Sequence, residues 1–147
     1  MILRSLYQQC LGLADAIAGA HPYGTIFHPQ WLAIRAQRSG MRYAATFASG
    51  VLVDVGCGAK PYEPWFRQHV NAYVGLEYPV TVCKNGGPAV RADVYATVLA
   101  LPLRDNAADT ALLTEVLEHT PEPGRALEEL HRTLGKDGTL ILTSPMI

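Results

Sequence analysis

Val51-Leu-Val-Asp-Val-Gly-Cys-Gly58 joins a run of β-prone apolar residues to two closely spaced glycines. An apolar run of this length predicts a buried strand of a parallel sheet over 51–55. Gly56 and Gly58 allow the backbone to turn tightly, and they let a ligand approach without meeting a Cβ atom. Asp54 lies near the carboxyl end of the strand, where ligands of open α/β sheets bind. The stretch therefore predicts the rim of a nucleotide-type pocket.

The segments after this loop alternate between strand and helix patterns. Further strands are predicted at 72–77, 90–93, 110–114 and 139–143, and helices at 64–70 and 123–134. Gly135 is expected to end the second helix, and 136–138 to form the turn that follows it. The alternation indicates the α/β class, with a Rossmann-like, doubly wound and mostly parallel sheet. We expect a helical extension over 1–48 and the Rossmann-like domain over 49–147.

Glu77 ends the second predicted strand and follows Gly58 by about 19 residues. At an offset of about 20 residues, a carboxylate on the second strand can bind both hydroxyls of a ribose. Taken singly, a glycine loop often serves steric needs and an acid at a strand end is often only solvated. Their spacing favours the ribose interpretation. The third glycine of the dinucleotide fingerprint would fall on Pro61, which argues against a nicotinamide cofactor.

From about residue 51 to residue 145 the chain resembles class I S-adenosylmethionine-dependent methyltransferases, of the methyltransferase type 11 kind. The resemblance is carried by motifs in a fixed order: Asp54-Val-Gly-Cys-Gly58, Glu77, Asp93-Val94, Leu101-Pro102, Asp109, Glu115-Val-Leu-Glu-His119, Leu134-Gly-Lys-Asp-Gly138 and a strand ending at Pro145. Each motif is degenerate alone, whereas the ordered set is specific. Lys60 departs from the pattern, since many members have a third small residue there.

The resemblance implies S-adenosylmethionine as the cofactor. Its methionine portion would lie against the backbone of Gly56, Cys57 and Gly58, with Asp54 as the partner of the ammonium, directly or through water. Further implied contacts are Glu77 to the ribose, Asp93 with Val94 beside it to the adenine, Tyr78 over the adenine face, and Glu115 in the pocket lining. Tyr78 after a strand is as often plain packing.

The implied reaction is a direct displacement at the methyl carbon, so the main task of the enzyme is to align the reactants and exclude water. His119 is a candidate general base for an acceptor hydroxyl, because the pKa of an imidazole suits neutral pH. Glu115, Glu118 and His119 could instead hold a divalent cation, or cap a helix. We assign no metal. The acceptor is expected to be a small molecule or a lipid-linked hydroxyl, with oxygen, nitrogen and carbon nucleophiles all open.

Composition fits one compact domain with a small extension. Hydrophobic residues make up 49% of the 147 residues and charged residues 17%. The formal net charge of -1 gives no electrostatic reason to expect a nucleic-acid partner. The three cysteines, Cys10, Cys57 and Cys83, are scattered without C-x-x-C spacing, so neither a disulfide framework nor a zinc site is indicated. A reducing cytoplasm is the expected location.

The two ends of the chain carry separate expectations. Residues 1–20 have apolar residues on one helical face, which favours an amphipathic helix over a secretory signal, and no segment has the roughly 20 apolar residues of a membrane span. The chain stops at Ile147, whereas the resembling fold usually continues through a helix and two strands. An apolar edge at 140–142 would then invite pairing with another chain, so a homo-oligomer, a truncated form and a partial gene product are all open.

Two other functional classes compete with a methyltransferase. A non-catalytic module that retains the nucleotide fold for binding or assembly is the stronger alternative, because the late elements of the fold are missing from the sequence. An NAD(P)-dependent oxidoreductase is less favoured, because the third glycine of its fingerprint is absent.

Overall fold

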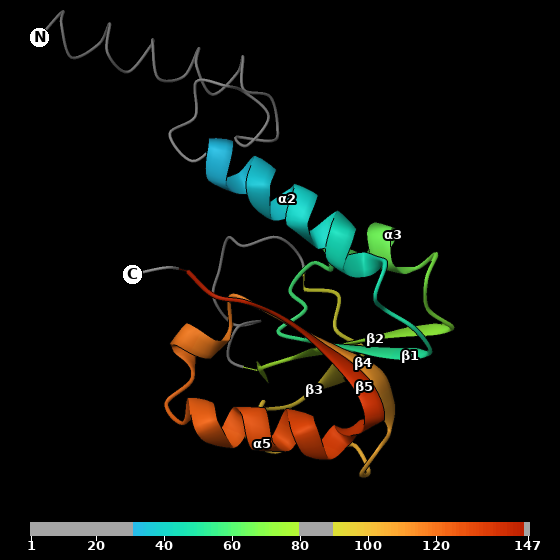
Figure 1. Cartoon of the computed structure of the whole chain (residues 1–147). Coiled ribbons are helices and arrows are strands. Elements are labelled where there is room, and N and C mark those ends of the chain that lie inside the picture. The colour runs from blue at the N-terminus through green and yellow to red at the C-terminus, as the bar shows by residue number, and fades with distance from the viewer. Residues whose placement is uncertain (1–30, 80–89, 146–147) are drawn as a thin grey trace, which may run out of the picture. The chain divides into compact units, whose positions relative to one another are not determined.

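The computed structural model describes residues 31–79 and 90–145 (Figure 1). The predicted helix at 1–20, with Cys10, lies outside these residues, as does Cys83. The chain divides into two compact units, Met1–Met41 and Arg42–Ile147. In the first unit the described residues all belong to helix α2 (Trp31–Ala45), which continues into the second. The boundary expected between residues 48 and 49 stays a prediction.

The second unit contains a five-stranded sheet in the order β3-β2-β1-β4-β5, with every neighbouring pair parallel. Its strands are β1 (Val51–Val55), β2 (Ala72–Glu77), β3 (Val94–Tyr95), β4 (Ala108–Thr114) and β5 (Leu134–Thr143). This order confirms the Rossmann-like fold class. The chain runs outward from β1 to β3 on one side and returns to β4 on the other. The strand order therefore reverses between β1 and β4, and ligands bind at such a switch point, beyond the carboxyl ends of the strands.

Helices cover the sheet. Helix α5 (Pro123–Thr133) begins with proline at its first position and buries Ala126, Leu130 and Thr133. Leu130 belongs to a core cluster with Val53 and Val55 of β1, so α5 packs on the side chains that alternate toward that face. Helix α3 (Glu63–Phe66) lies on the other side of the sheet from α5 in Figure 1 and buries Phe66 completely. A short 3-10 turn, η1 (Leu117–His119), precedes α5.

The first expected helix is shorter than the sequence pattern predicts. Helix α3 stops at Phe66 instead of continuing to residue 70. The amide of His69 donates to the carbonyl of Phe66 over 2.9 Å, a tight three-residue turn that ends the helix before β2.

The third strand begins later than expected, at Val94 instead of residue 90. The Arg91 amide donates to the carbonyl of Gly58 over 2.8 Å, so the chain is bonded to the glycine loop at that point, and the Asp93 amide then donates to the Gly75 carbonyl of β2 over 2.8 Å. Only Val94 and Tyr95 pair in register, with Leu76 and Glu77.

The end of α5 also differs from the expectation. Gly135 does not end the helix, which stops at Thr133; Leu134 is already extended and pairs with Ala108 of β4. Residues 136–138 lie in an irregular part of β5, where the register shifts before Thr139 pairs with Thr110. No helix within the described residues is long and apolar enough to cross a bilayer.

Candidate functional site

Both glycines of the loop after β1 have a positive φ, and Gly56 also has no room for a side chain. Gly56 has φ +79°, and a Cβ atom there would lie 2.2 Å from Cγ2 of Val116. Its amide and that of Cys57 both donate to the carbonyl of Leu76, over 2.8 and 3.1 Å, which binds the loop to the end of β2. Gly58 has φ +49°, but its Cβ position is open. The loop thus presents bare backbone at the end of the central strand.

Glu77 is held in place by the backbone around it. Its side chain is buried, its Oε2 accepts a hydrogen bond from the Gly58 amide at 2.8 Å, and its Oε1 accepts one from the Tyr78 amide at 2.9 Å. Each carboxylate oxygen has two lone pairs, so both retain accepting capacity for a ligand. A fixed carboxylate with this capacity suits two adjacent hydroxyls.

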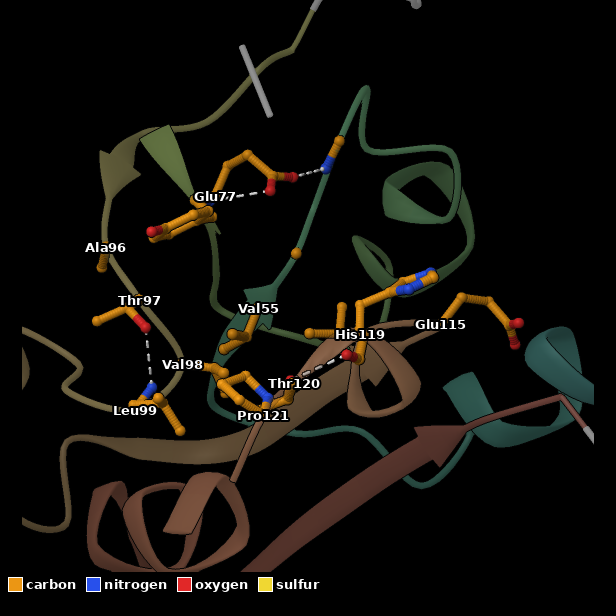
Figure 2. Close-up of a pocket in the computed structure, with 14 residues that line it drawn as sticks. Val55, Glu77, Ala96, Thr97, Val98, Leu99, Glu115, His119, Thr120 and Pro121 are labelled. Carbon is orange, nitrogen blue, oxygen red and sulfur yellow. Dashed lines mark hydrogen bonds between the residues drawn. The ribbon is translucent and has the colours of Figure 1, made fainter. Parts of the chain in front are cut away.

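A cavity of about 510 Å³ opens at the carboxyl ends of β1, β2 and β4 (Figure 2). It is lined by loop glycines, by the acid at the end of β2, by the segment after β3 and by the segment after β4: Val55, Gly56, Gly58, Glu77, Tyr78, Ala96, Thr97, Val98, Leu99, Glu115, Val116, His119, Thr120 and Pro121. Mostly apolar walls with a few oriented polar groups are typical of small-molecule sites. Six of the predicted site residues therefore lie around one cavity: Gly56, Gly58, Glu77, Tyr78, Glu115 and His119.

Asp54 does not line this cavity. Only 1% of the residue is exposed, its Oδ2 accepts the Tyr73 hydroxyl at 2.5 Å, and its Oδ1 is buried with no hydrogen-bond partner among the residues that the structure describes. Burial raises the pKa of the Asp54 carboxyl to about 6. A carboxylate enclosed in this way is not open to direct contact with a ligand ammonium.

Asp93 is likewise outside the cavity lining, as are Cys57 and Val94. The Oδ2 atom of Asp93 accepts hydrogen bonds from Lys60 Nζ at 2.5 Å and from the Gly75 amide at 2.7 Å. The Lys60 ammonium holds the pKa of the Asp93 carboxyl below its usual range. Cys57 is buried, and burial raises the pKa of its thiol to about 12, which keeps the thiol protonated. Sequence reasoning did not foresee that Asp93 and Lys60 are paired.

The acidic motif after β4 is spread apart. Glu115 has φ +53°, and its Oε1 accepts the Thr143 hydroxyl at 3.0 Å; Figure 2 shows its carboxylate pointing away from the other cavity side chains. The His119 side chain is 79% exposed, with Nε2 4.0 Å from Oε1 of Glu118. Within 31–79 and 90–145, no three His, Cys, Asp or Glu side chains are grouped so that they could hold a metal ion. The roles suggested for Glu115, Glu118 and His119 stay predictions.

The walls contain residues that the motif analysis missed. The segment Ala96–Leu99 follows β3 and forms one wall, where Thr97 Oγ1 accepts the Leu99 amide at 3.3 Å. Thr120 and Pro121 form another part of the lining, after η1. The only signal in the sequence was the short run of mainly apolar residues after Asp93, which has no motif of its own.

Comparison with known proteins gives a consistent result. A family model described as a methyltransferase domain matches residues 53–142. A protein described as an uncharacterized methyltransferase from Mycobacterium leprae is 32% identical over 97 residues, covering 63% of this chain and 36% of that protein. Among solved structures, a SAM-dependent methyltransferase from Thermotoga maritima superposes with a TM-score of 0.56 at 25% identity, over 77% of this chain and 54% of the other.

Another structural neighbour is described as a cyclase. The [4+2]-cyclase SpnF superposes with a TM-score of 0.58 at 26% identity, over 74% of this chain and 44% of that protein. The chain spans 36% to 45% of the length of the curated relatives it matches.

Proposed function

Because this chain belongs to the methyltransferase domain family, we propose that it binds S-adenosylmethionine and forms the donor-binding part of a methyltransferase. S-adenosylmethionine is the cofactor that this membership and the structural neighbours imply. The observation that supports the proposal most directly is the Glu77 carboxylate, which is held by the Gly58 amide at 2.8 Å beside the cavity.

The residues present fit such a cofactor. Glu77 would accept the two ribose hydroxyls, because both of its oxygens keep lone pairs after bonding the backbone. The bare backbone at Gly56 and Gly58 would lie along the methionine portion. Tyr78, Val98 and Leu99 would enclose the adenine, since an apolar wall and an aromatic ring suit a flat base.

Asp54 and Asp93 enter this proposal indirectly, because neither lines the cavity. Asp54 would act through its bond with the Tyr73 hydroxyl. Asp93 would act through its bond with Lys60, and Thr97 is a polar residue in the wall that follows β3. The adenine contact expected of Asp93 and Val94 stays a prediction, and we propose that the segment after β3 adds a wall beside the base.

When bound, the cofactor would supply a sulfonium methyl group for displacement by a nucleophile. The chain would contribute alignment and the exclusion of water by its apolar walls. His119 reaches the cavity lining with an exposed imidazole and would accept a proton from an acceptor hydroxyl. Family membership implies a small-molecule acceptor, and we retain a small or lipid-linked hydroxyl as the proposed class.

We also retain three further expectations as proposals. Leu140 and Leu142 on the edge strand β5 are 38% and 39% exposed, which supports association of two copies through this edge. A cytoplasmic location and the lack of a nucleic-acid partner rest on composition alone.

The second candidate is a domain that has kept the fold for binding or assembly without catalysis, or for another reaction, and the cyclase among the structural neighbours supports only the latter. Isothermal titration of the full chain with S-adenosylmethionine, S-adenosylhomocysteine and NAD separates the candidates. We expect binding of the first two ligands and none of NAD. No detectable binding of any of the three ligands would contradict the proposal.

A screen of methyl acceptors with labelled donor then tests transfer itself. Transfer of label to a small-molecule hydroxyl would support the methyltransferase, and an acceptor with a nitrogen or carbon nucleophile would revise its class. Binding without transfer to any acceptor would favour the second candidate.

A further inference from the structure

Lys60 combines two features that a surface lysine does not have. Its backbone has φ +56°, a conformation that residues with a side chain rarely adopt, and the residue is only 6% exposed. Its side chain passes directly over Gly75 of β2, where a Cβ atom would lie 2.4 Å from Lys60 Cε. The absence of a side chain at Gly75 of β2 thus leaves room for the Lys60 side chain, which indicates a specific role for this lysine.

The ammonium of Lys60 belongs to a set of contacts between the glycine loop and the chain entering β3. Lys60 Nζ donates to Asp93 Oδ2 at 2.5 Å, and the Arg91 amide donates to the Gly58 carbonyl at 2.8 Å. Arg91 also forms an ion pair with Glu63 of α3 at 3.7 Å. We call these five residues, Gly58, Lys60, Glu63, Arg91 and Asp93, the loop clasp.

The two segments joined by the loop clasp lead into different parts of the cavity lining. Gly58 directs its amide to Glu77 on one side. Asp93 is followed by the two residues of β3 and then by the wall Ala96–Leu99. The Gly75 amide also donates to Asp93 Oδ2, and the Ala96 amide donates to the Glu77 carbonyl, so the position of Asp93 is transmitted to the wall through the β2–β3 pairing.

We propose that Lys60 is a positioning residue for the nucleoside part of the cofactor. The Lys60 ammonium fixes Asp93, and Asp93 in turn fixes the Ala96–Leu99 wall relative to the Gly58 amide and Glu77. This inference rests on the proposed function. When only a fraction of the protein has the binding geometry, the observed affinity falls by that fraction. A lysine that holds the cavity in its binding geometry therefore increases the affinity for the ligand. An ordinary structural ion pair would stabilise the fold without changing the geometry of the cavity in the folded protein.

The test compares Lys60→Met, which keeps a long unbranched side chain and removes its charge, with Asp93→Asn and with the double variant. Lys136→Met is the matched control, since Lys136 is an exposed lysine on β5. For each full-length chain we would measure the Kd of S-adenosylhomocysteine by titration, the folded fraction by urea unfolding, and the Gly58 amide resonance of the ligand-free protein by NMR.

We expect Lys60→Met to raise Kd about tenfold, because a charge-assisted hydrogen bond of this kind is worth a factor of about ten or more in an equilibrium. Asp93→Asn should have a similar effect, and the double variant should be no weaker than the worse single variant, because both changes break one contact. The Gly58 resonance should move in free Lys60→Met protein, and Lys136→Met should match the wild type.

Three results would overturn the inference while leaving the proposed function intact. These are an unchanged Kd in Lys60→Met, losses that multiply in the double variant, and a loss of affinity that follows the folded fraction with the Gly58 resonance unmoved. If the wild-type chain itself fails to bind S-adenosylhomocysteine, the proposed function falls, and the inference falls with it.

Discussion

Replacing Asp54 with asparagine should remove a pH-dependent loss of stability that is built into the centre of the sheet. Asp54 is enclosed beside Tyr73, and one of its oxygens has no partner. Burial raises the pKa of its carboxyl from 3.8 to about 6 in the folded chain. The native state therefore holds this proton more tightly than the unfolded state does.

The sign and size follow from that difference in pKa. Below the unfolded value both states are protonated, and the stability of the fold is fully present. As pH rises toward the folded value, the unfolded chain loses the proton first, so the free energy of unfolding falls. A difference of about 2 pKa units corresponds to roughly 3 kcal/mol, of which roughly 2 kcal/mol is lost between about pH 4.5 and about pH 7.5.

Asparagine keeps an oxygen acceptor for the Tyr73 hydroxyl and has no titrating proton. Its buried amide nitrogen would lack a partner, at a cost of about 1–3 kcal/mol that is the same at every pH. Asp54→Asn should thus change the free energy of unfolding by the same amount at every pH. It should also remove the contribution of Asp54 to the pH dependence of that free energy. The difference in the free energy of unfolding between the variant and the wild type should shift by roughly 2 kcal/mol in favour of Asp54→Asn between about pH 4.5 and about pH 7.5.

Urea unfolding of both proteins at several pH values measures this gap directly, and all other titrating groups cancel in the difference. Parallel stability curves for the two proteins would refute the reasoning, because they would mean that Asp54 titrates alike in the folded and unfolded chain. A gap that shifts in the opposite direction would show that Asp54 is stabilised as an anion in the native state.

Three further predictions concern the site and the core. Glu77→Ala should weaken binding of S-adenosylhomocysteine by about 1–3 kcal/mol by calorimetry, with Glu77→Gln intermediate, because the ribose loses a charged acceptor; equal affinity in all three proteins would remove Glu77 from the site. Gly56→Val should destabilise the fold by about 2–4 kcal/mol in urea, since its side chain meets Val116 at a positive φ; a stability near that of the wild type would contradict this placement. Leu130→Ala should cost about 2–5 kcal/mol because Leu130 is completely buried, whereas Leu127→Ala on the same helix should cost clearly less because Leu127 is 38% exposed; equal losses would place the core elsewhere.

The positions of β1 and β2 along the chain could be predicted because their patterns are local. The residues Val51–Val55 and Ala72–Glu77 are short apolar runs bounded by polar or glycine residues, and both are strands with the predicted bounds. The third strand was misplaced because its start depends on a contact that the local pattern does not contain. Asp93 is paired with Lys60, which lies 33 residues earlier in the chain.

The sequence by itself determined that β1 ends in an acid and two glycines, that Glu77 follows at ribose spacing, and that the elements alternate as in a Rossmann-like fold. These features depend on residue type and on short spacings. Only the tertiary structure decided which carboxylates face the cavity. Glu77 does, because the Gly58 amide holds it beside the cavity. Asp54 and Asp93 are not among the lining residues, and the Oδ2 atom of each accepts a hydrogen bond from a residue distant in sequence, Tyr73 and Lys60 respectively. The direction of a side chain at a strand end is set by partners that folding brings near, and strand periodicity cannot identify them.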